Sequence, residues 1–144
     1  MKTYQHTQRG TLILITMLAT ALVLAAVCFF AKWQGYWVVP ILLLSGWLFH
    51  SLTIEITEGE LRWRFGPGLI RKRVKLTDIV SAKVVRTNVL EGWGIHLSRF
   101  GWLYNVSGFD AVAVAMRNGD RFALGTDEPE MLVAELSRSQ LPSR

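Results

Sequence analysis

The sequence predicts a membrane-anchored α+β protein, in which a hairpin of two transmembrane helices precedes a small, strongly bent antiparallel sheet or barrel. Two apolar runs fill most of the first 52 residues, and His50 is the one titratable side chain within them apart from a cysteine and a tyrosine. After these runs, apolar and polar residues alternate as in half-buried strands, and the last segment returns to helical spacing. We therefore expect an N-terminal cytoplasmic tail at 1–10, a helical hairpin at 11–52 and one cytosolic domain at 53–144.

The two apolar runs are long enough to cross a bilayer as helices. Residues 11–31 would form a helix of about 31 Å and residues 36–52 one of about 25 Å, against a hydrocarbon core of about 30 Å. A cleaved signal peptide does not fit the first run, because its apolar region is only about 7–15 residues long. Aromatic residues gather where the two helices would meet, as at a membrane interface: Trp33, Tyr36 and Trp37.

Charged residues predict the orientation of this hairpin. Lys2 and Arg9 precede the first helix, Lys32 is the one charged residue in the connection, and many lysines and arginines follow residue 52. The positive-inside rule then places both termini in the cytoplasm. Cys28, the single cysteine, lies within the first apolar run, which excludes a disulfide framework and a cysteine metal site.

Two hairpins are predicted in the domain. A turn at Glu58-Gly59 pairs apolar residues on one face (Leu52 with Phe65, Ile54 with Trp63, Ile56 with Leu61) and sets Glu55 opposite Arg62 on the other. Asn118-Gly119 predicts a two-residue type I′ turn that pairs Ala113 with Leu124 and Ala115 with Phe122. Both faces of this second hairpin are largely apolar, so the closing helix or a partner protein is expected to cover one of them.

The chain is expected to end in an amphipathic helix at about 127–139. Asp127 and Glu130 have the spacing of a capping box, and Pro129 would lie in the first turn. Leu132 and Leu136 would share the face that packs against the sheet.

The order of these elements resembles a known family. Two membrane helices and meandering strands are followed by GWGI (92–95), GWLYNVSG (101–108) and GTDEPE (125–130), a combination similar to small bacterial inner-membrane proteins with a pleckstrin-homology-like domain. The resemblance covers most of the chain. It implies a bent sheet of about seven strands closed by the C-terminal helix. It implies no active site, because the fold serves lipid binding, peptide binding and scaffolding alike.

Residues of the kinds that carry catalysis are scattered along the chain. His6 lies in the expected tail, His50 at a membrane boundary and His96 in an aromatic stretch, without the spacing of metal ligands. Each group of carboxylates has a structural explanation at a turn, a cross-strand pair or a helix start. We therefore expect no enzyme, no metal and no cofactor, although a histidine–carboxylate contact in a cleft would reopen the question.

Basic residues form the clearest candidate surface. Strand alternation would bring five cations to one sheet face: Arg62, Arg64, Arg71, Arg73 and Lys75. Each cation near an anionic leaflet adds about 1 kcal/mol of attraction, so this face is a candidate for anionic lipid or for a partner. The alternative is a solvated face that only supports the membrane topology, with Arg62 neutralised by Glu55. Nucleic acid is not expected, because no helix carries a basic stripe.

The aromatic stretch at 92–108 has two parities. Apolar side chains occupy odd positions up to Leu97 and even positions from Trp102, which predicts two half-buried strands with a turn or bulge at 98–101. Its aromatic rings are expected to fill the core of a small domain. The remainder is a candidate partner-contact surface: His96, Arg99, Phe100 and the hydroxyl of Tyr104.

These observations predict a non-catalytic module that is held at the membrane. We expect it to serve as an accessory, scaffold or assembly component of a membrane protein complex, in contact with the lipid bilayer and with a membrane or cytosolic protein partner. The alternative function is direct recognition of anionic lipid headgroups through the basic residues.

Overall fold

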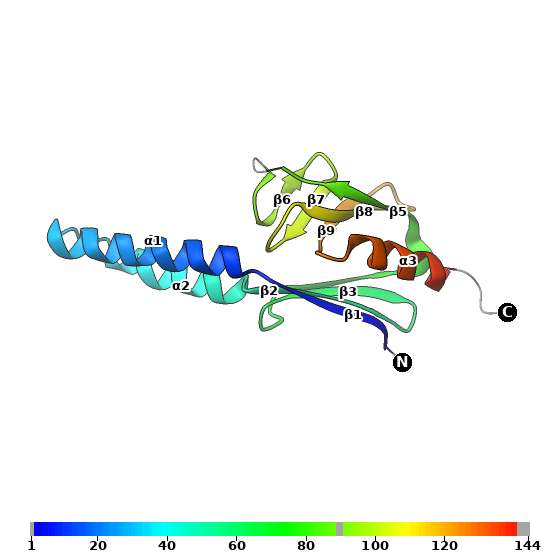
Figure 1. The fold of residues 1–144 in the computed structure, drawn as a ribbon, viewed down its shortest axis with the longest axis horizontal. Coiled ribbons are helices and arrows are strands. Elements are labelled where there is room, and N and C mark those ends of the chain that lie inside the picture. Colours follow the sequence, from blue (N-terminus) through cyan, green and yellow to red (C-terminus); the bar gives the residue numbers. More distant parts are fainter. Residues whose placement is uncertain (1, 89–90, 141–144) are drawn as a thin grey trace.

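A computed structural model describes residues 2–88 and 91–140, which form an elongated molecule with a helical arm at one end (Figure 1). The helices are α1 (Thr11–Phe30), the short 3-10 helix η1 (Gly35–Trp37), α2 (Val38–Leu48), the 3-10 helix η2 (Leu76–Asp78) and α3 (Pro129–Gln140). The strands are β1 (Lys2–Arg9), β2 (Ser51–Thr57), β3 (Glu60–Phe65), β4 (Arg71–Lys75), β5 (Ile79–Arg86), β6 (Gly94–Ser98), β7 (Gly101–Asn105), β8 (Asp110–Met116) and β9 (Arg121–Gly125).

The strands form two sheets that face each other across the core. Within the described residues, the first sheet has the order β1-β2-β3-β4 and the second the order β5-β8-β9-β7-β6. Neighbouring strands are antiparallel except for β7 and β9, which run parallel. The predicted α+β class with a C-terminal helix is confirmed. The described strands number nine rather than about seven, and one of the additional strands comes from the expected tail.

The N-terminal segment is a strand, not a tail. Residues 2–9 form β1, which pairs with β2 so that Tyr4 lies opposite Ile56 and His6 opposite Ile54. The hydroxyls of Thr7 and Thr53 are 2.9 Å apart across this pair. The sequence KTYQHTQR does not predict a strand, because polar residues occupy both of its faces and no alternation of apolar and polar residues is present. Even the buried Gln8 is polar. Met1, which the same prediction included, lies outside the described residues.

The helical arm consists of α1, η1 and α2, and its surface is apolar all around. α1 is long and apolar enough to cross a membrane, and its side chains are mostly exposed, as at Ile15, Leu22 and Phe30. α2 packs beside α1, where a side chain at Gly46 would meet Met17. The second apolar helix is shorter than the predicted 36–52. With η1 it covers Gly35–Leu48, about 21 Å, because residues 51 and 52 belong to β2.

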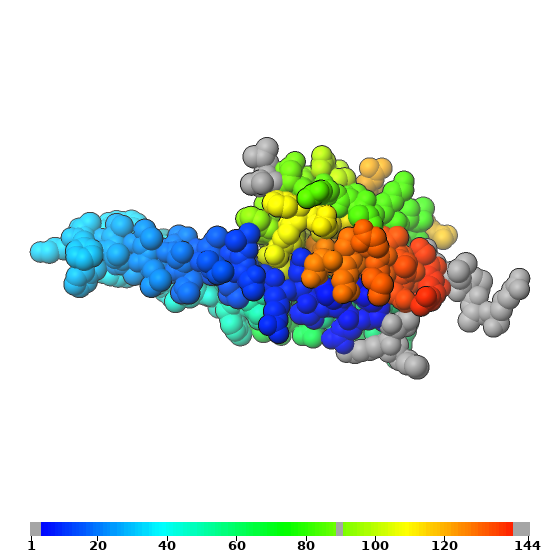
Figure 2. Space-filling view, viewed as in Figure 1, coloured from blue at the N-terminus to red at the C-terminus, as the bar shows by residue number. Residues whose placement is uncertain are grey.

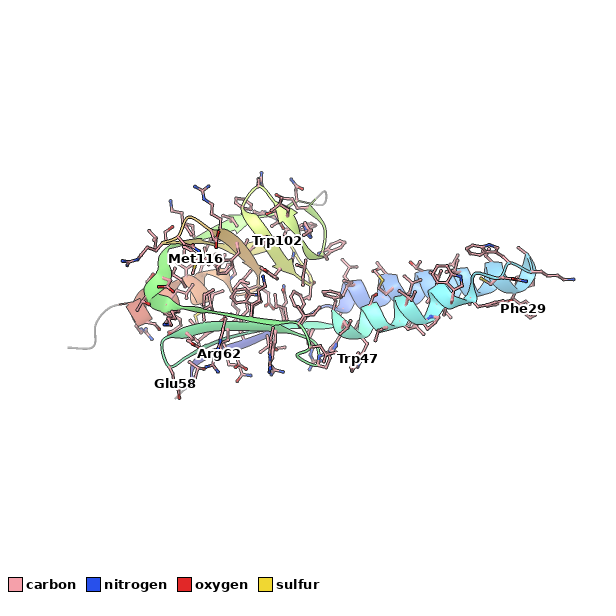
Figure 3. All side chains as sticks on the ribbon, turned by 180° about the vertical axis from the view of Figure 1, so that it is seen from behind. Phe29, Trp47, Glu58, Arg62, Trp102 and Met116 are labelled. Atoms are coloured by element: carbon pink, nitrogen blue, oxygen red, sulfur yellow. The ribbon has the colours of Figure 1, made fainter. Side chains whose placement is uncertain are left out.

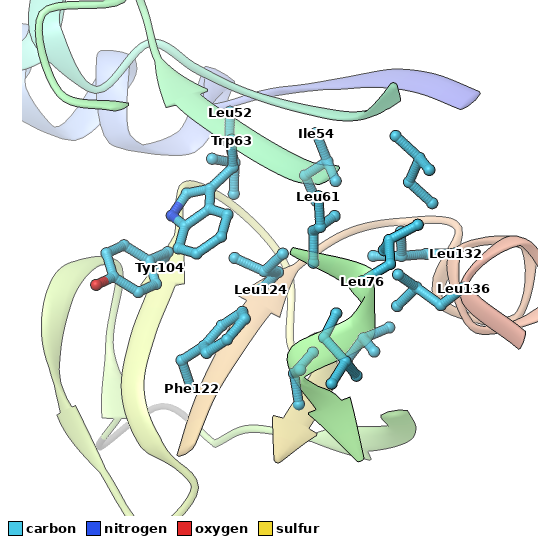
Figure 4. Close-up of a cluster of buried hydrophobic side chains, with 14 of the residues drawn as sticks. Leu52, Ile54, Leu61, Trp63, Leu76, Tyr104, Phe122, Leu124, Leu132 and Leu136 are labelled. Carbon is cyan, nitrogen blue, oxygen red and sulfur yellow. The ribbon is translucent and has the colours of Figure 1, made fainter. Parts of the chain in front are cut away.

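Aromatic and aliphatic side chains from both sheets meet in one core (Figure 4). The Trp63 ring stacks on Phe122 with 4.9 Å between ring centroids, and Tyr104 meets Trp63 edge-on at 5.3 Å. Leu132 and Leu136 of α3 are fully buried in the same cluster. The α3 helix therefore packs its apolar face against the core between the two sheets. It lies beside β1 on the molecular surface (Figure 2).

The β2–β3 hairpin has the predicted register. All three apolar pairs lie opposite one another, and Glu55 lies opposite Arg62. Glu58 and Gly59 have φ angles of 52° and 79°, the two positive values that a two-residue type I′ turn requires. The turn and the alternation of the strands thus agree, and the hairpin could be predicted locally.

The β8–β9 hairpin differs from the prediction by one residue. Val114 lies opposite Phe122, and the Met116 amide donates to the Asp120 carbonyl at 2.9 Å, so the loop has three residues rather than two. Gly119 ends this loop with φ 92°, a left-handed position typical of three-residue hairpin loops. A shift by one residue moves every side chain to the other face. The large side chains thereby face the core and the small ones face outward.

Part of the outer face of the second sheet is covered by the chain itself. Leu103, Ala111 and Ala123 are fully buried there, and Phe100 and Val85 pack against them. The α3 helix does not cover this face, since it contributes its leucines to the core on the opposite side.

Candidate functional site

The five predicted cations do share one face, the outer face of the first sheet. Arg62 lies opposite Arg73 and Arg64 opposite Arg71, while Lys75 lies opposite Glu60. Because alternate residues of a strand point to opposite sides, these side chains all point away from the core. Figure 3 shows Arg62 on the side of the first sheet that faces away from the second sheet, between Trp47 and Glu58.

These side chains border a groove, here called the basic groove. It has a volume of about 560 Å³ and runs across β2, β3 and β4. Its lining residues are Thr53, Glu55, Arg62, Trp63, Arg64, Arg71, Lys72 and Arg73. Trp63 and Lys72 belong to the alternate set that points to the core side, where the Lys72 Nζ atom lies 5.4 Å from the centroid of the Tyr104 ring.

Two carboxylates partly neutralise the groove. Glu60 Oε2 lies 2.8 Å from Arg62 Nη2 and 4.0 Å from Arg73 Nη1. Glu55 Oε1 lies 3.8 Å from Arg64 Nη2. The predicted neutralisation of Arg62 by Glu55 is therefore incorrect in its pairing, because Glu60 on the same strand is closer to Arg62 and Glu55 pairs diagonally with Arg64.

Positive charge remains in excess in this face. Directly opposed like charges destabilise a sheet, so two arginine pairs side by side are an unfavourable arrangement for folding alone. In the described part of the chain, Arg71 has no carboxylate within ion-pair distance. The Arg73 side chain is 72% exposed. Arginine presents a planar fork of donors that matches carboxylate and phosphate oxygens, so the groove is suited to bind an anionic group.

A histidine–carboxylate contact exists, but it lies outside the groove. His6 Nε2 is 2.5 Å from Asp127 Oδ1, and His6 Nδ1 is 3.2 Å from Glu128 Oε2. Both carboxylate side chains are well exposed, at 63% and 45%. Asp127 therefore holds β1 rather than capping α3 as predicted, and Thr126 Oγ1 accepts the Glu128 amide at 3.1 Å instead. The contact joins the first strand to the last helix, which is a structural role.

The same corner contains a tyrosine with a shifted pKa. Burial raises the pKa of the Tyr4 hydroxyl to about 12, and the negative charges of Glu128, Asp127 and Glu135 add to the shift. Over the residues that the structure describes, no three histidine, cysteine or acidic side chains are arranged to hold a metal ion.

The predicted contact surface is only partly assembled: the Arg99 guanidinium lies over the Phe100 ring at 4.7 Å, and His96 lies opposite Leu103, against which Phe100 packs, but Tyr104 is elsewhere. Tyr104 is buried in the core between the sheets, at 3% exposure. Phe100 packs on the outer face of the second sheet, and Arg99 donates from Nη2 to the Arg86 carbonyl at 2.8 Å and pairs with Glu91 at 3.3 Å. His96 has a buried Nε2 atom. These side chains order the chain locally, as the interpretation of the stretch as a folding device implies.

Two apolar residues of the aromatic stretch were expected in the core but are exposed. Leu97 and Trp102 are opposite each other on β6 and β7, and they are 72% and 51% exposed. Their parity is as predicted, since Ile95 and Tyr104 on the same face pack into the core. Leu97 lies on β6, which is an edge strand of the second sheet.

The first sheet continues directly from the helical arm. Gly10 joins β1 to α1, and Phe49 and His50 join α2 to β2. The Gly10 amide donates to the His50 carbonyl at 2.7 Å, so the two connections are bonded to each other. A Cβ at Gly10 would lie 2.8 Å from the Phe49 carbonyl oxygen, which leaves room for glycine alone. The strands of the first sheet therefore extend along the long axis of the molecule (Figure 1).

Neither a model of a known protein family, nor a curated protein, nor a solved structure matches this chain. Its function is inferred from the basic groove and from the position of the groove beside the helical arm.

Proposed function

We propose that this protein is a non-catalytic docking module of a membrane protein complex. The helical arm holds it in the bacterial inner membrane with both termini in the cytoplasm, and the basic groove binds an acidic segment of a partner protein. The domain is proposed to be a variant of the pleckstrin-homology-like fold, with β1 added to the first sheet. The observation that carries this proposal is the row of opposed arginines beside an exposed apolar arm.

The exposure of the arm supports the anchoring. A core helix of a soluble protein is mostly buried, whereas only 17% of the most apolar 18-residue stretch of α1 is buried here. A signal sequence is removed after export, whereas β1, which precedes α1, is integrated into the first sheet. Trp47 at the domain end and three aromatic residues at the other end would form the interfacial belts: Trp33, Tyr36 and Trp37.

The height of the groove above the arm favours a protein partner. Counted along β2 from Ser51, the level of Arg64 and Arg71 lies about 7 Å away and that of Arg62 and Arg73 about 13 Å away. The Debye length at physiological salt is about 8 Å, so a charged membrane surface is felt mainly by the nearer pair. The farther pair faces the aqueous side of the interface, where an acidic protein segment can reach it.

Anionic lipid remains the second candidate ligand, and one observation favours it. Arg9, Arg64 and Arg71 lie on the part of the first sheet next to the arm, close to where headgroups would be. Each would add about 1 kcal/mol of attraction to an anionic leaflet.

Paired charge variants test the proposal in the full-length protein. The far pair variant is Arg62→Gln with Arg73→Gln, and the near pair variant is Arg64→Gln with Arg71→Gln. A control with the same change of charge is Lys83→Gln with Arg121→Gln, two exposed residues on the second sheet. Each protein is purified from native membranes in mild detergent, and its bound proteins and lipids are identified by mass spectrometry.

We expect the far pair variant to lose an acidic protein that the wild type and the control retain. If the wild type carries no such protein, or if the far pair variant retains it, docking by the groove is contradicted. A loss of anionic lipid in the near pair variant, with no protein bound in any sample, would favour the lipid function instead.

A further inference from the structure

The loop between β3 and β4, residues 66–70, lies against the end of the helical arm. The Gly66 amide donates to the Ser51 carbonyl at 2.8 Å, at the start of β2. A Cβ at Gly66 would lie 2.6 Å from the Leu48 carbonyl oxygen and 2.9 Å from that of Trp47. The loop is therefore level with the last turn of α2, where the arm would enter the membrane.

This loop has a closed shape and presents one apolar side chain outward. The Phe65 amide donates to the Ile70 carbonyl at 2.9 Å, and the Gly68 amide donates to the Phe65 carbonyl at 2.7 Å. Gly68 has φ 90°, a conformation that favours glycine. Ile70 packs against the core, whereas Leu69 at the tip is 72% exposed.

The surroundings of Leu69 differ from those of a typical surface leucine. Single exposed leucines are common on proteins, but this one belongs to the loop whose Gly66 lies against the Trp47 carbonyl, and the Trp47 side chain is 51% exposed on the last turn of α2. Leu69 thus continues the apolar surface of the arm onto the domain. Arg64 and Arg71, opposite each other on β3 and β4, stand at the base of the loop. Figure 3 shows Trp47 at the arm end of the first sheet and Glu58 at the opposite end.

We propose that loop 66–70 is a third contact of this protein with the bilayer, in addition to the two apolar helices. Leu69 inserts at the boundary between headgroups and acyl chains, and Arg64 and Arg71 bind lipid phosphates beside it. An apolar loop tip flanked by arginines suits a membrane interface. The apolar side chain and the methylene groups of the arginines lie in the apolar region, while the charged guanidinium groups stay in water near the phosphates. The proposal rests on the anchoring proposed above.

The contact assigns different roles to the two arginine pairs. With the loop in the interface, the near pair of the basic groove is engaged by lipid and the far pair stays open to a protein partner. The domain is also fixed in rotation about the axis of the arm, so the groove faces along the membrane surface in one direction.

Fluorescence in liposomes tests the contact. The full-length protein with Cys28→Ala receives one environment-sensitive fluorophore at Leu69→Cys, and it is reconstituted in phosphatidylcholine and phosphatidylglycerol with or without brominated acyl chains. Leu22→Cys on the exposed side of α1 is the positive control, and Glu58→Cys at the far turn is the negative control. We expect a blue-shifted spectrum and quenching by brominated lipid at positions 69 and 22, and neither effect at position 58.

The outcomes separate the two proposals. Quenching at position 22 with a water-like spectrum at position 69 overturns the loop contact and leaves the anchoring intact. The absence of quenching at both positions contradicts the anchoring itself. As a second measurement, Arg64→Gln with Arg71→Gln in the labelled protein is expected to reduce quenching at position 69, and unchanged quenching would remove the lipid-phosphate role of these arginines.

Discussion

The two sheets of this domain differ in what their outer faces do. On β2 and β3 of the first sheet, apolar residues point toward the core and polar or charged residues point toward the solvent. The second sheet buries apolar residues on both faces, and Phe100 and Val85 pack against the buried part of its outer face. That part of the outer face is not available to a partner. The difference therefore directs the search for function to the first sheet.

The difference also shows in side-chain size. Val112, Val114 and Leu124 of the second sheet face the core, while the outer positions of β8 are alanines that lie opposite Gly125, Ala123 and Arg121 of β9. Small outer residues let Phe100 approach the sheet closely, and Arg99 holds this turn by its bonds to Arg86 and Glu91. On the first sheet, the outer positions of β3 and β4 carry long cations that nothing in the described chain covers.

The largest effect is expected where the two sheets meet. Replacement of Trp63 with alanine removes the stack on Phe122 and leaves a cavity between the sheets, at a cost of about 3–5 kcal/mol. The matched control is Trp102→Ala. Because Trp102 is 51% exposed, this variant should lose much less stability than Trp63→Ala. Urea unfolding of the full-length protein measures both, and equal losses would contradict the location of the core.

A pair of glycines tests the packing of the second sheet. Gly101 and Gly119 both have φ 92°, but a Cβ at Gly101 would collide with the Arg121 carbonyl, whereas Gly119 has open space. Gly119→Ala is expected to cost about 1–2 kcal/mol from its backbone conformation alone. Gly101→Ala should cost about 1–3 kcal/mol more because of overpacking. Thermal unfolding measures the stability of the two variants. A larger loss of stability for Gly119→Ala than for Gly101→Ala would contradict the close packing of Gly101 against the Arg121 carbonyl.

Substitutions on the two outer faces compare the sheets directly. Phe100→Ala uncovers the apolar outer face of the second sheet and is expected to cost about 2 kcal/mol, below the range for a fully buried phenylalanine. Arg62→Gln on the first sheet should change the free energy of unfolding by less than about 0.5 kcal/mol, since surface substitutions usually have small effects. Denaturant midpoints measure the stability of both variants. Similar losses of stability would mean that the outer faces of the two sheets do not differ in their contribution to folding.

The smallest effect concerns Tyr4, on β1, a strand of the first sheet whose core side is partly polar. Its pKa of about 12 lies above the ordinary tyrosine value of 10.0, so the folded protein retains the tyrosine proton when the unfolded chain releases it. The free energy of unfolding is therefore unaffected below pH 10 and falls as the pH rises toward 12. Tyr4→Phe should lose less stability over this interval. Urea midpoints on both sides of pH 10 measure the difference, and parallel alkaline losses in the two proteins would show that Tyr4 is not the cause.

The two hairpins show how far the sequence predicts the fold. Alternation and turn chemistry agree at 52–65, so local information was sufficient for the register. At 113–124, Asn118-Gly119 is compatible with loops of two or three residues, and the choice depends on which side chains the core can accept. β1 was missed because its partner β2 lies beyond the whole helical arm, and its polar sequence has no apolar face that predicts a strand.

The candidate site was predictable in the same partial way. Strand alternation around two turns was enough to place the five cations on one face. The choice of Glu60 as the partner of Arg62 depends on side-chain geometry that alternation does not describe. The contact of His6 with Asp127 joins residues 121 positions apart, so no local pattern could indicate it.

By itself, the sequence determined the apolar arm, the turn at Glu58-Gly59 and the side of the first sheet on which the arginines stand, because each depends on neighbours in the chain. The tertiary structure alone decided that the N-terminal segment completes the first sheet, that part of the outer face of the second sheet is covered by Phe100, and that the loop carrying Leu69 lies at the base of the arm. These features depend on contacts between residues far apart in the chain, where burial of apolar surface rather than local geometry selects the arrangement.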